Sequence, residues 1–348
     1  AKREERSVLI HIETQKGKGF ASAEHDPERF HGIAPYNAYK QKAGKTFSNV
    51  FGGIIAQLAE KNNKICAITA GMTNNTGLYD FSKKYPKRFF DVGICEQHAV
   101  TLAAGLARAG LRPVVAIYST FLQRAYDQIV HDVALQNLPV IFAVDRAGLV
   151  GEDGPTHHGV FDLSYLRSIP NMTVMAPSDE NELVQMFHTA FTLDGPVAIR
   201  YPRGVGLGIS VNTPYQSLPV GRGVMLQQGQ DLAVIGVGRG TSLGRELVEL
   251  LAQHGINASL ADARYVKPVD RQLISRLACT HKYLVTIEDN IISGGFGSAV
   301  LETLQEERLQ ADLLRVGIPD EFVEHGKVDI LFEYLDMRPE AIMESIFN

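Results

Sequence analysis

The stretch FFDVGICEQHAVTLAAGLARAGLRPVVAIYSTFLQRAYDQ, residues 89–128, contains the pattern that decides the fold. It begins with an apolar and β-branched run, residues 89–94, and then becomes rich in Ala and Gly with helical spacing. Glu96 lies at that change. A strand that leads into a helix places the junction side chain at the carboxyl edge of a sheet, where open α/β folds bind their ligands. The stretch therefore predicts an α/β fold with Glu96 at its ligand-binding edge.

A second apolar run, residues 113–117, leads to Tyr118, Phe121 and Arg124, which lie three residues apart. We expect the two runs to be adjacent strands, so that a carboxylate, two aromatic rings and a guanidinium face one crevice. A Glu in the first turn of a helix often does no more than interact with the helix macrodipole. A single Arg is often only a surface charge. The combination favours a functional site.

The composition is that of a chain long enough for two hydrophobic cores, with 348 residues, of which 45% are hydrophobic and 21% charged. A net charge of −5 gives no electrostatic reason to expect nucleic acid binding. There is no apolar run of eighteen residues and no signal-peptide core, so we expect no membrane association and a cytoplasmic location. Three widely spaced cysteines in apolar surroundings predict three buried thiols rather than disulfides, namely Cys66, Cys95 and Cys279.

The order of apolar runs and helical patterns predicts two doubly wound α/β domains, at residues 41–210 and 211–348. Residues 205–221, which are rich in Gly, Pro and Ser/Thr, separate them. Residues 7–14 alternate and predict one further strand, before which no partner strand occurs. We therefore expect residues 1–40 to be the remnant of a preceding domain and its exit loop.

A fully apolar strand is predicted at residues 138–144, and its character suits a parallel strand that is buried on both faces. It ends in Asp145 and Arg146, and the Gly-rich loop GLVGEDGPTHHGVFD, residues 148–162, follows. Such loops often carry the chemistry of a site. His157, His158 and Asp153 suggest a zinc site at first sight, but no further spaced ligand accompanies them, so we expect no metal there.

The segment GVGRGTSLG, residues 236–244, suggests a dinucleotide-binding turn. Its spacing is GxGxG and not GxGxxG, and Ser and Thr follow where close helix packing needs small residues. A plain strand-to-helix turn is the favoured interpretation.

Six segments resemble transketolase-like thiamine diphosphate enzymes, and in particular the 1-deoxy-D-xylulose-5-phosphate synthase family. They are DPERFHG (26–32), FDVGICEQHAV (90–100), YSTFLQRAYDQ (118–128), GEDGPTHHGVFD (151–162), RYVKPVD (264–270) and TIEDNIISGGFGSAV (286–300). The resemblance covers nearly the whole chain. It implies a transketolase-type pyrimidine-binding domain followed by a transketolase C-terminal domain, which mainly builds a homodimer.

The resemblance also implies an activity, the condensation of pyruvate with D-glyceraldehyde 3-phosphate and loss of carbon dioxide, with thiamine diphosphate as cofactor. The roles it implies are catalytic for Glu96, His157 and His31, cofactor-binding for Glu96, Phe121 and Ile94, and substrate-binding for Tyr118, Arg124, Arg146, Asp153 and Arg203. The Arg residues suit a phosphorylated substrate because a guanidinium binds phosphate in a bidentate manner. Arg124 either joins them or forms an ion pair with Asp127 or Asp153.

One departure from the family is plain, because the chain contains no Gly-Asp-Gly motif for a metal-bound diphosphate. By the resemblance, the Mg²⁺ and diphosphate site would lie on a missing N-terminal domain, and we expect this chain alone to be inactive. Three alternatives remain open. These are a β subunit of a 2-oxo acid dehydrogenase E1, the C-terminal half of a transketolase, and a non-catalytic remnant.

Overall fold

The computed structural model describes residues 1–25, 27, 30 and 44–347, and the chain divides into two compact units, residues 1–43 and 44–348. In the first unit a short helix, α1 (Ala21–His25), follows Phe20, whose ring packs edge-to-face on Phe30 at 5.5 Å. Residues 7–14 are exposed and form no strand, so that prediction is wrong. A strand needs a partner for its backbone groups, and none of the described residues pairs with this segment.

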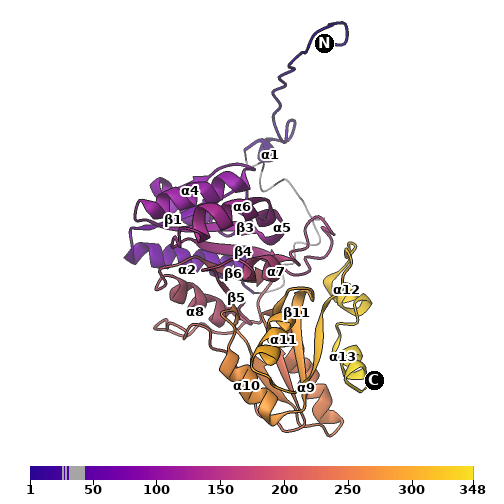
Figure 1. The fold of residues 1–348 in the computed structure, drawn as a ribbon. Coiled ribbons are helices and arrows are strands. Elements are labelled where there is room, and N and C mark those ends of the chain that lie inside the picture. The colour runs from indigo at the N-terminus through magenta and orange to yellow at the C-terminus, as the bar shows by residue number, and fades with distance from the viewer. Residues whose placement is uncertain (26, 28–29, 31–43, 348) are drawn as a thin grey trace. The chain divides into compact units, whose positions relative to one another are not determined.

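The second unit contains two sheets, and the larger has seven strands in the order β10-β5-β6-β4-β3-β1-β2 (Figure 1). All neighbours are parallel except β10 and β5. The strands are β1 (Ile65–Thr69), β2 (Phe89–Asp91), β3 (Arg112–Tyr118), β4 (Ile141–Ala147), β5 (Thr173–Met175), β6 (Val197–Pro202) and β10 (Tyr265–Lys267). The doubly wound α/β class predicted from the sequence is confirmed.

Helices cover both faces of this sheet and bury two separate apolar clusters. One face carries α2 (Phe47–Lys61), α3 (Tyr79–Lys84) and α8 (Glu180–Ala190), with the short turn η2 (Pro86–Arg88) before β2. The other carries α4 (Glu96–Arg108), α7 (Asp162–Arg167) and a segmented helical stretch. The amphipathic helices begin where side chains cap them, since Thr46 accepts from Asn49 N–H at 3.2 Å and Asp179 accepts from Glu182 N–H at 2.9 Å.

The segmented stretch, which follows β3, is not one regular helix. It consists of α5 (Ser119–Leu122), the 3₁₀ turn η3 (Gln123–Ala125), α6 (Tyr126–Gln128) and the π-helical η4 (Ile129–Ala134). Such changes of helical pitch often occur at functional sites, because they re-aim the side chains that follow a strand.

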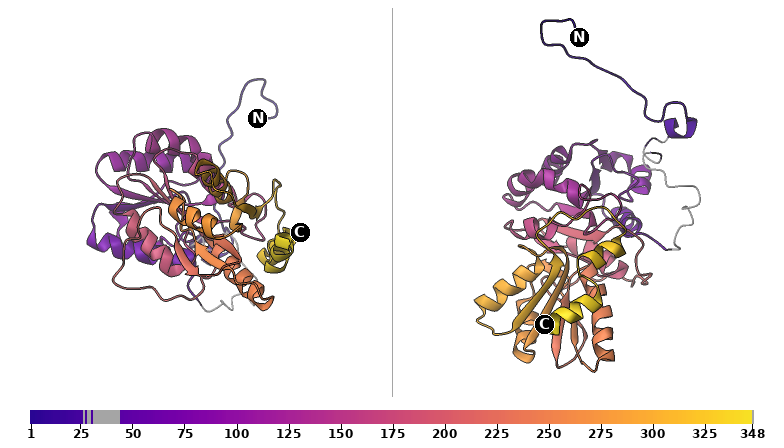
Figure 2. Two further views of the ribbon diagram at one scale, coloured as in Figure 1. Left: turned by 60° about the horizontal axis from the view of Figure 1, so that its bottom comes forward. Right: turned by 90° about the vertical axis from the view of Figure 1, so that its right-hand side faces the viewer.

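The smaller sheet has five strands in the order β12-β11-β8-β9-β7 and is also covered on both faces (Figures 1 and 2). Only β7 runs antiparallel to its neighbour. Its elements are β7 (Val224–Gln227), β8 (Leu232–Gly236), β9 (Ser259–Asp262), β11 (Tyr283–Ile291), β12 (Asp312–Ile318), α9 (Arg239–Gln253), α10 (Arg271–Thr280), α11 (Phe296–Glu306), α12 (Val328–Tyr334) and α13 (Pro339–Phe347). The segment 236–239 is a strand-to-helix turn, as predicted.

One strand of the larger sheet, β10, comes from the part of the chain that forms the smaller sheet. Residues 258–266 do not form one continuous strand, because the chain turns at Arg264, whose φ is +58°. Residues before the turn form β9 in the smaller sheet, while β10 pairs antiparallel with β5 of the larger sheet, with Tyr265 opposite Met175. The domain limits of 41–210 and 211–348 remain a prediction. By its position in the sequence β10 belongs to the second range, but it pairs with a strand of the first.

Two further expectations concern the surface. Cys66 is buried but Cys95 and Cys279 are exposed, so the prediction of three buried thiols is wrong for two of them. Apolar neighbours in sequence do not fix the direction of a side chain, since Cys95 precedes α4 in a loop and Cys279 points outward from α10. Among the described residues, none of the helices combines the length and the hydropathy needed to cross a membrane.

Candidate active site

The predicted site residues lie at the carboxyl edge of the seven-stranded sheet. Tyr118 ends β3, Arg146 lies near the end of β4 and Arg203 directly follows β6. Glu96 follows β2, but β1 lies between β2 and β3, so the expectation that the two strands are adjacent is wrong. Because β1 to β4 and β6 are parallel, the side chains nevertheless meet at one edge of the sheet.

Glu96 is the first residue of α4 and is only 3% exposed. Its Oε1 accepts a hydrogen bond from Nη1 of Arg124 at 3.4 Å, and the Arg124 guanidinium lies over the ring of Phe121 at 5.2 Å. Arg124 therefore forms its ion pair with Glu96, and not with Asp127 or Asp153 as the sequence suggested. The side chain of Asp153 is already held by other cations.

Three aromatic rings form a connected group beside Glu96. Phe121 stacks on Tyr118 with ring centres 5.7 Å apart, and His157 meets the Phe121 ring edge-on at 5.3 Å. The Tyr118 hydroxyl is buried and accepts or donates no hydrogen bond among the described residues. Burial raises the pKa of Tyr118 above its ordinary value, so the phenol stays protonated. Its O–H is a donor that a bound oxygen atom could satisfy.

Two guanidinium groups share one carboxylate. Arg203 Nη1 donates to Asp153 Oδ2 at 2.7 Å, and Arg146 Nη1 lies 3.6 Å from the same oxygen. Arg203 also donates to the carbonyl of Val150 at 3.0 Å, and Arg146 lies over the Tyr118 ring at 4.0 Å. Two cations and one anion leave a net positive charge, and this arrangement can bind an anionic substrate group.

Asp145 was not singled out from the sequence, although it follows a wholly apolar strand. Its side chain is fully buried, and its oxygens accept from the Ser48 hydroxyl and from the Arg146 N–H, each at 2.7 Å. Burial raises the pKa of Asp145 to about 6, and the hydrogen bonds and the Arg146 charge oppose this only in part. Arg146 itself has a φ of +55°, a conformation that costs on the order of 1 kcal/mol and often occurs at functional sites.

The two consecutive histidines have different surroundings. The ring of His157 faces Phe121, and its Nδ1 lies 2.9 Å from the Thr156 hydroxyl. His158 is buried, its Nδ1 accepts the Val150 N–H at 3.1 Å, and its Nε2 lies 3.2 Å from the carbonyl of Glu324. Since Nδ1 accepts, Nε2 carries the proton and donates. Burial lowers the pKa of His158, which favours this neutral form.

A buried charge network lies beneath the loop and connects the two sheets. Arg200 of β6 donates to Asp162 at 3.2 Å and forms a second ion pair with Asp289 of β11. Ser119 also donates to Asp162, at 2.9 Å. Burial raises the pKa of Asp162, while the Arg200 charge opposes that shift. Sequence reasoning missed this network, because its members lie far apart in the chain.

Most predicted site residues thus form one connected group, in which ion pairs, ring contacts and cation–π contacts join Glu96, Arg124, Phe121, His157, Tyr118, Arg146, Asp153 and Arg203. Ile94 lies two residues before Glu96 with 83% of its surface exposed. His31 lies outside the described residues. No metal-binding group of three or more His, Cys, Asp or Glu side chains occurs in the described part of the chain.

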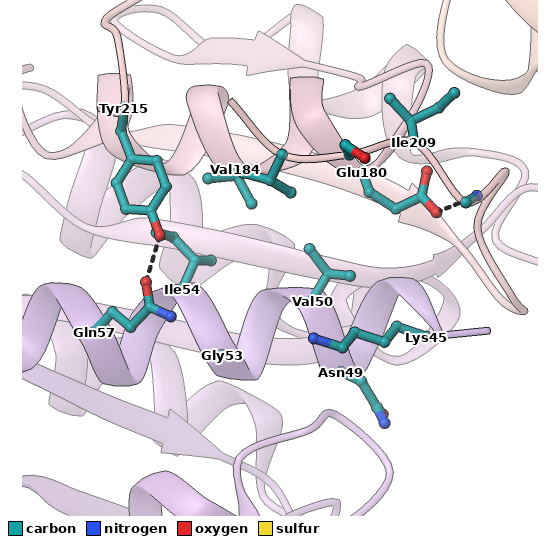
Figure 3. A pocket seen from close by; sticks show the side chains of 13 residues that line it. Lys45, Asn49, Val50, Gly53, Ile54, Gln57, Glu180, Val184, Ile209 and Tyr215 are labelled. Carbon is teal, nitrogen blue, oxygen red and sulfur yellow. Dashed lines mark hydrogen bonds between the residues drawn. The ribbon is translucent and has the colours of Figure 1, made fainter. Parts of the chain in front are cut away.

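A separate groove of about 440 Å³ lies between α2, α8 and residues 208–215 (Figure 3). Lys45, Asn49 and Gln57 line one side and Glu180 and Tyr215 the other. Tyr215 and Gln57 are hydrogen-bonded across it, and Glu180 accepts the Gly208 N–H at 2.7 Å. None of the predicted site residues lines this groove, which lies on the α2 and α8 face of the sheet.

Comparison with protein families identifies both halves of the second unit. Residues 43–206 match the model described as "Transketolase, pyrimidine binding domain". Residues 221–342 match "Transketolase, C-terminal domain".

Curated relatives are similar over nearly the whole chain. The 1-deoxy-D-xylulose-5-phosphate synthase of Syntrophomonas wolfei is 60% identical over 343 residues, which are 97% of this chain and 54% of the relative. The 1-deoxy-D-xylulose-5-phosphate synthase 1 of Geobacter sulfurreducens is 53% identical over 326 residues, which are 92% of this chain and 51% of the relative. The chain therefore spans about half the length of the curated relatives it matches.

Two solved structures show the same fold. One, described as "Split gene transketolase, inactive beta4 tetramer", is 30% identical with a TM-score of 0.77, and the match covers 87% of this chain and 97% of that one. Transketolase from Campylobacter jejuni has a TM-score of 0.73 at 18% identity, over 92% of this chain and 48% of its own. At that identity the second match supports the fold alone.

Proposed function

The chain belongs to the transketolase family and is similar within it to the 1-deoxy-D-xylulose-5-phosphate synthases, and from that premise we propose that it forms the pyrimidine-binding half of such an enzyme. The reaction is the condensation of pyruvate with D-glyceraldehyde 3-phosphate, with loss of carbon dioxide. A Mg²⁺ requirement, a homodimer and a cytoplasmic location belong to the same proposal and rest on the resemblance.

The observation that carries the proposal is the buried carboxyl of Glu96, which Arg124 joins to the ring of Phe121. A carboxyl in this position can hydrogen-bond a ring nitrogen of an aminopyrimidine, and an aromatic ring nearby offers a face for stacking. Both features fit thiamine diphosphate, which when bound supplies a thiazolium ring as an electron sink. Arg124 would orient the Glu96 carboxyl through Oε1.

The other end of the connected group suits a phosphorylated acceptor. Arg146 and Arg203 would bind the phosphate, and Asp153 holds both guanidinium groups in place until they do so. The Tyr118 hydroxyl, buried and without a partner among the described residues, would donate to a substrate oxygen. His157, between the two ends, is placed to hold or move a proton near the reacting atoms.

The chain by itself is proposed to be inactive, because no Gly-Asp-Gly motif for the diphosphate occurs in its sequence. The solved split-gene transketolase chain supports this view. It is almost fully covered by the match to this chain, and its description calls that assembly inactive. A diphosphate-binding domain would then complete the site.

The test is an assay for 1-deoxy-D-xylulose 5-phosphate from pyruvate and D-glyceraldehyde 3-phosphate, with thiamine diphosphate and Mg²⁺. The chain is assayed alone and with the diphosphate-binding half of the Syntrophomonas wolfei relative. We expect product only from the combination, and a loss of at least about 100-fold in kcat for Glu96→Gln, since general acid–base groups contribute that much. Glu60→Gln, an exposed Glu that pairs with Lys84, is the matched control.

Three results would contradict the proposal. Product from the chain alone would refute its inactivity, and an active Glu96→Gln variant would refute the role of Glu96. A folded, assembled combination that decarboxylates pyruvate but never forms the five-carbon product would instead favour a β subunit of a 2-oxo acid dehydrogenase.

A further inference from the structure

The two ends of the loop of residues 148–159 are hydrogen-bonded to each other. Gly148 and Gly159 exchange two backbone hydrogen bonds, at 2.7 and 2.8 Å, so the two ends of the loop are fixed side by side. Within it, His158 accepts the Val150 N–H and so connects the returning half of the loop to the outgoing half. The loop is therefore compact without any regular secondary structure between its ends.

Residues 323–328 contact the same loop. This segment belongs to the domain of the smaller sheet and leads from β12 into the first residue of α12. The His158 Nε2–H donates to the Glu324 carbonyl at 3.2 Å, and the Gly326 N–H donates to the Gly151 carbonyl at 3.4 Å. These bonds join residues more than 160 positions apart. Two different points of the loop are thus fixed to one short segment of the other domain.

The loop and this segment approach each other closely. A Cβ at Gly151 would lie 3.1 Å from the Gly326 carbonyl oxygen, and one at Gly154 would lie 3.0 Å from His325 Cβ. Leu149, at the start of the loop, belongs to the same buried apolar cluster as Val323. Contacts this close transmit the position of one segment to the other, because packed interiors deform little.

The fixed points flank the side chains that the site uses. Asp153 lies between Gly151 and Gly154, and His157 directly precedes His158. Asp153 in turn sets the position of the Arg203 guanidinium at 2.7 Å. A displacement of the loop would therefore move both the anion-binding group and the histidine that faces Phe121.

We propose that residues 323–328 act as a brace for the active-site loop and that His158 is the positioning residue through which the brace acts. The C-terminal domain then contributes to substrate binding through the position of this loop. The identity of the substrate that the braced groups bind rests on the proposed function, whereas the brace itself does not.

The hydrogen-bonding pattern of His158 gives a discriminating pair of variants. His158 uses one acceptor and one donor, and the side-chain amide of Gln offers the same two functions, whereas Ala offers neither. His158→Gln should retain the brace and His158→Ala should lose it. Val323→Ala weakens the brace from the other domain and leaves His158 in place. His131→Ala, at an exposed histidine beside Asp132, is the matched control.

The first measurement is hydrogen–deuterium exchange of the chain without cofactor. His158→Ala and Val323→Ala should each speed exchange of residues 149–158 about tenfold or more while β1 is unaffected, as expected for a local opening. His158→Gln and His131→Ala should match the wild type. In the combination with the diphosphate-binding half, His158→Ala should raise KM for D-glyceraldehyde 3-phosphate about tenfold with a smaller change in kcat, since misplacement of positioning groups has effects of this size.

The outcomes separate the two proposals. Wild-type exchange of the loop in both His158→Ala and Val323→Ala would overturn the brace, as would a His158→Gln variant that exchanges as fast as His158→Ala. Faster exchange in both, with rescue by Gln, establishes the brace even if the wild-type combination makes no product. A wild-type combination that makes no product would count against the proposed function and not against the brace.

Discussion

The two loops that carry the candidate site are held very differently. The loop of residues 148–159 is closed at its ends, packs on residues 323–328 of the other domain and lies above the buried charge network of Arg200. The loop of residues 92–95, before Glu96, is held by hydrogen bonds near its start and by one bond within it, from the Cys95 N–H to the Gly93 carbonyl at 2.8 Å. Near the start Asp91 accepts from the N–H groups of Gly71 and Gly93 at 2.8 and 3.0 Å. Beyond that point Ile94 and Cys95 are exposed.

This difference matches the two functions that we propose for the site. Groups that recognise a charged substrate gain from preorganisation, because little further ordering is needed when the substrate binds. The side with Arg146, Asp153 and Arg203 has this property and is fixed by both domains. The side with Glu96 has a buried carboxyl but an exposed apolar loop next to it.

The largest expected effect comes from the network beneath the braced loop. Arg200→Met removes the cation that pairs with both Asp162 and Asp289, and it leaves the two carboxylates buried without that ion pair. Loss of one partner of a buried pair typically costs about 3–5 kcal/mol of the free energy of unfolding. Urea unfolding measures the loss. Arg271→Met, at an exposed ion pair, is the control and should leave the urea midpoint nearly unchanged. Equal midpoints for both variants would show that the network does not support the loop.

A smaller effect depends on pH and concerns Asp145, at the strand end below the braced loop. Its pKa is about 6 in the folded chain against an ordinary 3.8, so the folded state binds more protons between these values. The free energy of unfolding therefore falls as pH rises through this window, by roughly 3 kcal/mol at most, and the penalty is complete above pH 6. Asp145→Asn cannot titrate and should lack this contribution.

Urea unfolding of the wild type and of Asp145→Asn at pH 4.5 and pH 7 tests this expectation. Other buried carboxyls with raised pKa values, such as Asp162, Glu182 and Glu288, are present in both proteins, so the difference between the two proteins isolates Asp145. If the free energies of unfolding of the wild type and of Asp145→Asn differed by the same amount at both pH values, Asp145 would not be buried in the way the structure shows.

The smallest effect is expected on the open side. Ile94 is 83% exposed, so Ile94→Ala should change the free energy of unfolding by no more than about 0.5 kcal/mol. If Ile94 contacts the cofactor as the resemblance implies, the same variant should weaken thiamine diphosphate binding several-fold in the combined enzyme. Thermal unfolding and a cofactor titration provide the two readouts. A large loss of stability would mean that this loop is packed as firmly as the braced one.

Local patterns predicted well those parts of the molecule that depend on neighbours in sequence. The helix at residues 47–61 and the buried strand β4 follow from periodicity and continuous apolar character. The positions of Glu96, Tyr118 and Arg203 at strand ends follow from the same patterns. Residues 7–14 show the limit of the method, because alternation alone does not provide a partner strand.

The partners of charged side chains could not be predicted in this way. Arg124 pairs with Glu96, 28 residues away, rather than with its neighbour Asp127. Arg200 forms an ion pair with Asp289, which lies 89 residues away in the sequence and in the other sheet. Such choices depend on which strand ends come together, and the position of β1 between β2 and β3 is not apparent from chain order.

The sequence by itself determined the α/β class, the strand-to-helix junctions and the functional groups available at their ends, because these follow from short-range periodicity and side-chain chemistry. The tertiary structure alone decided the order of the strands, the passage of β10 into the larger sheet and the separate surroundings of His157 and His158. The physical reason is that hydrogen bonds and packing between distant segments form only when both domains are in place, and two adjacent histidines then differ by what each one touches.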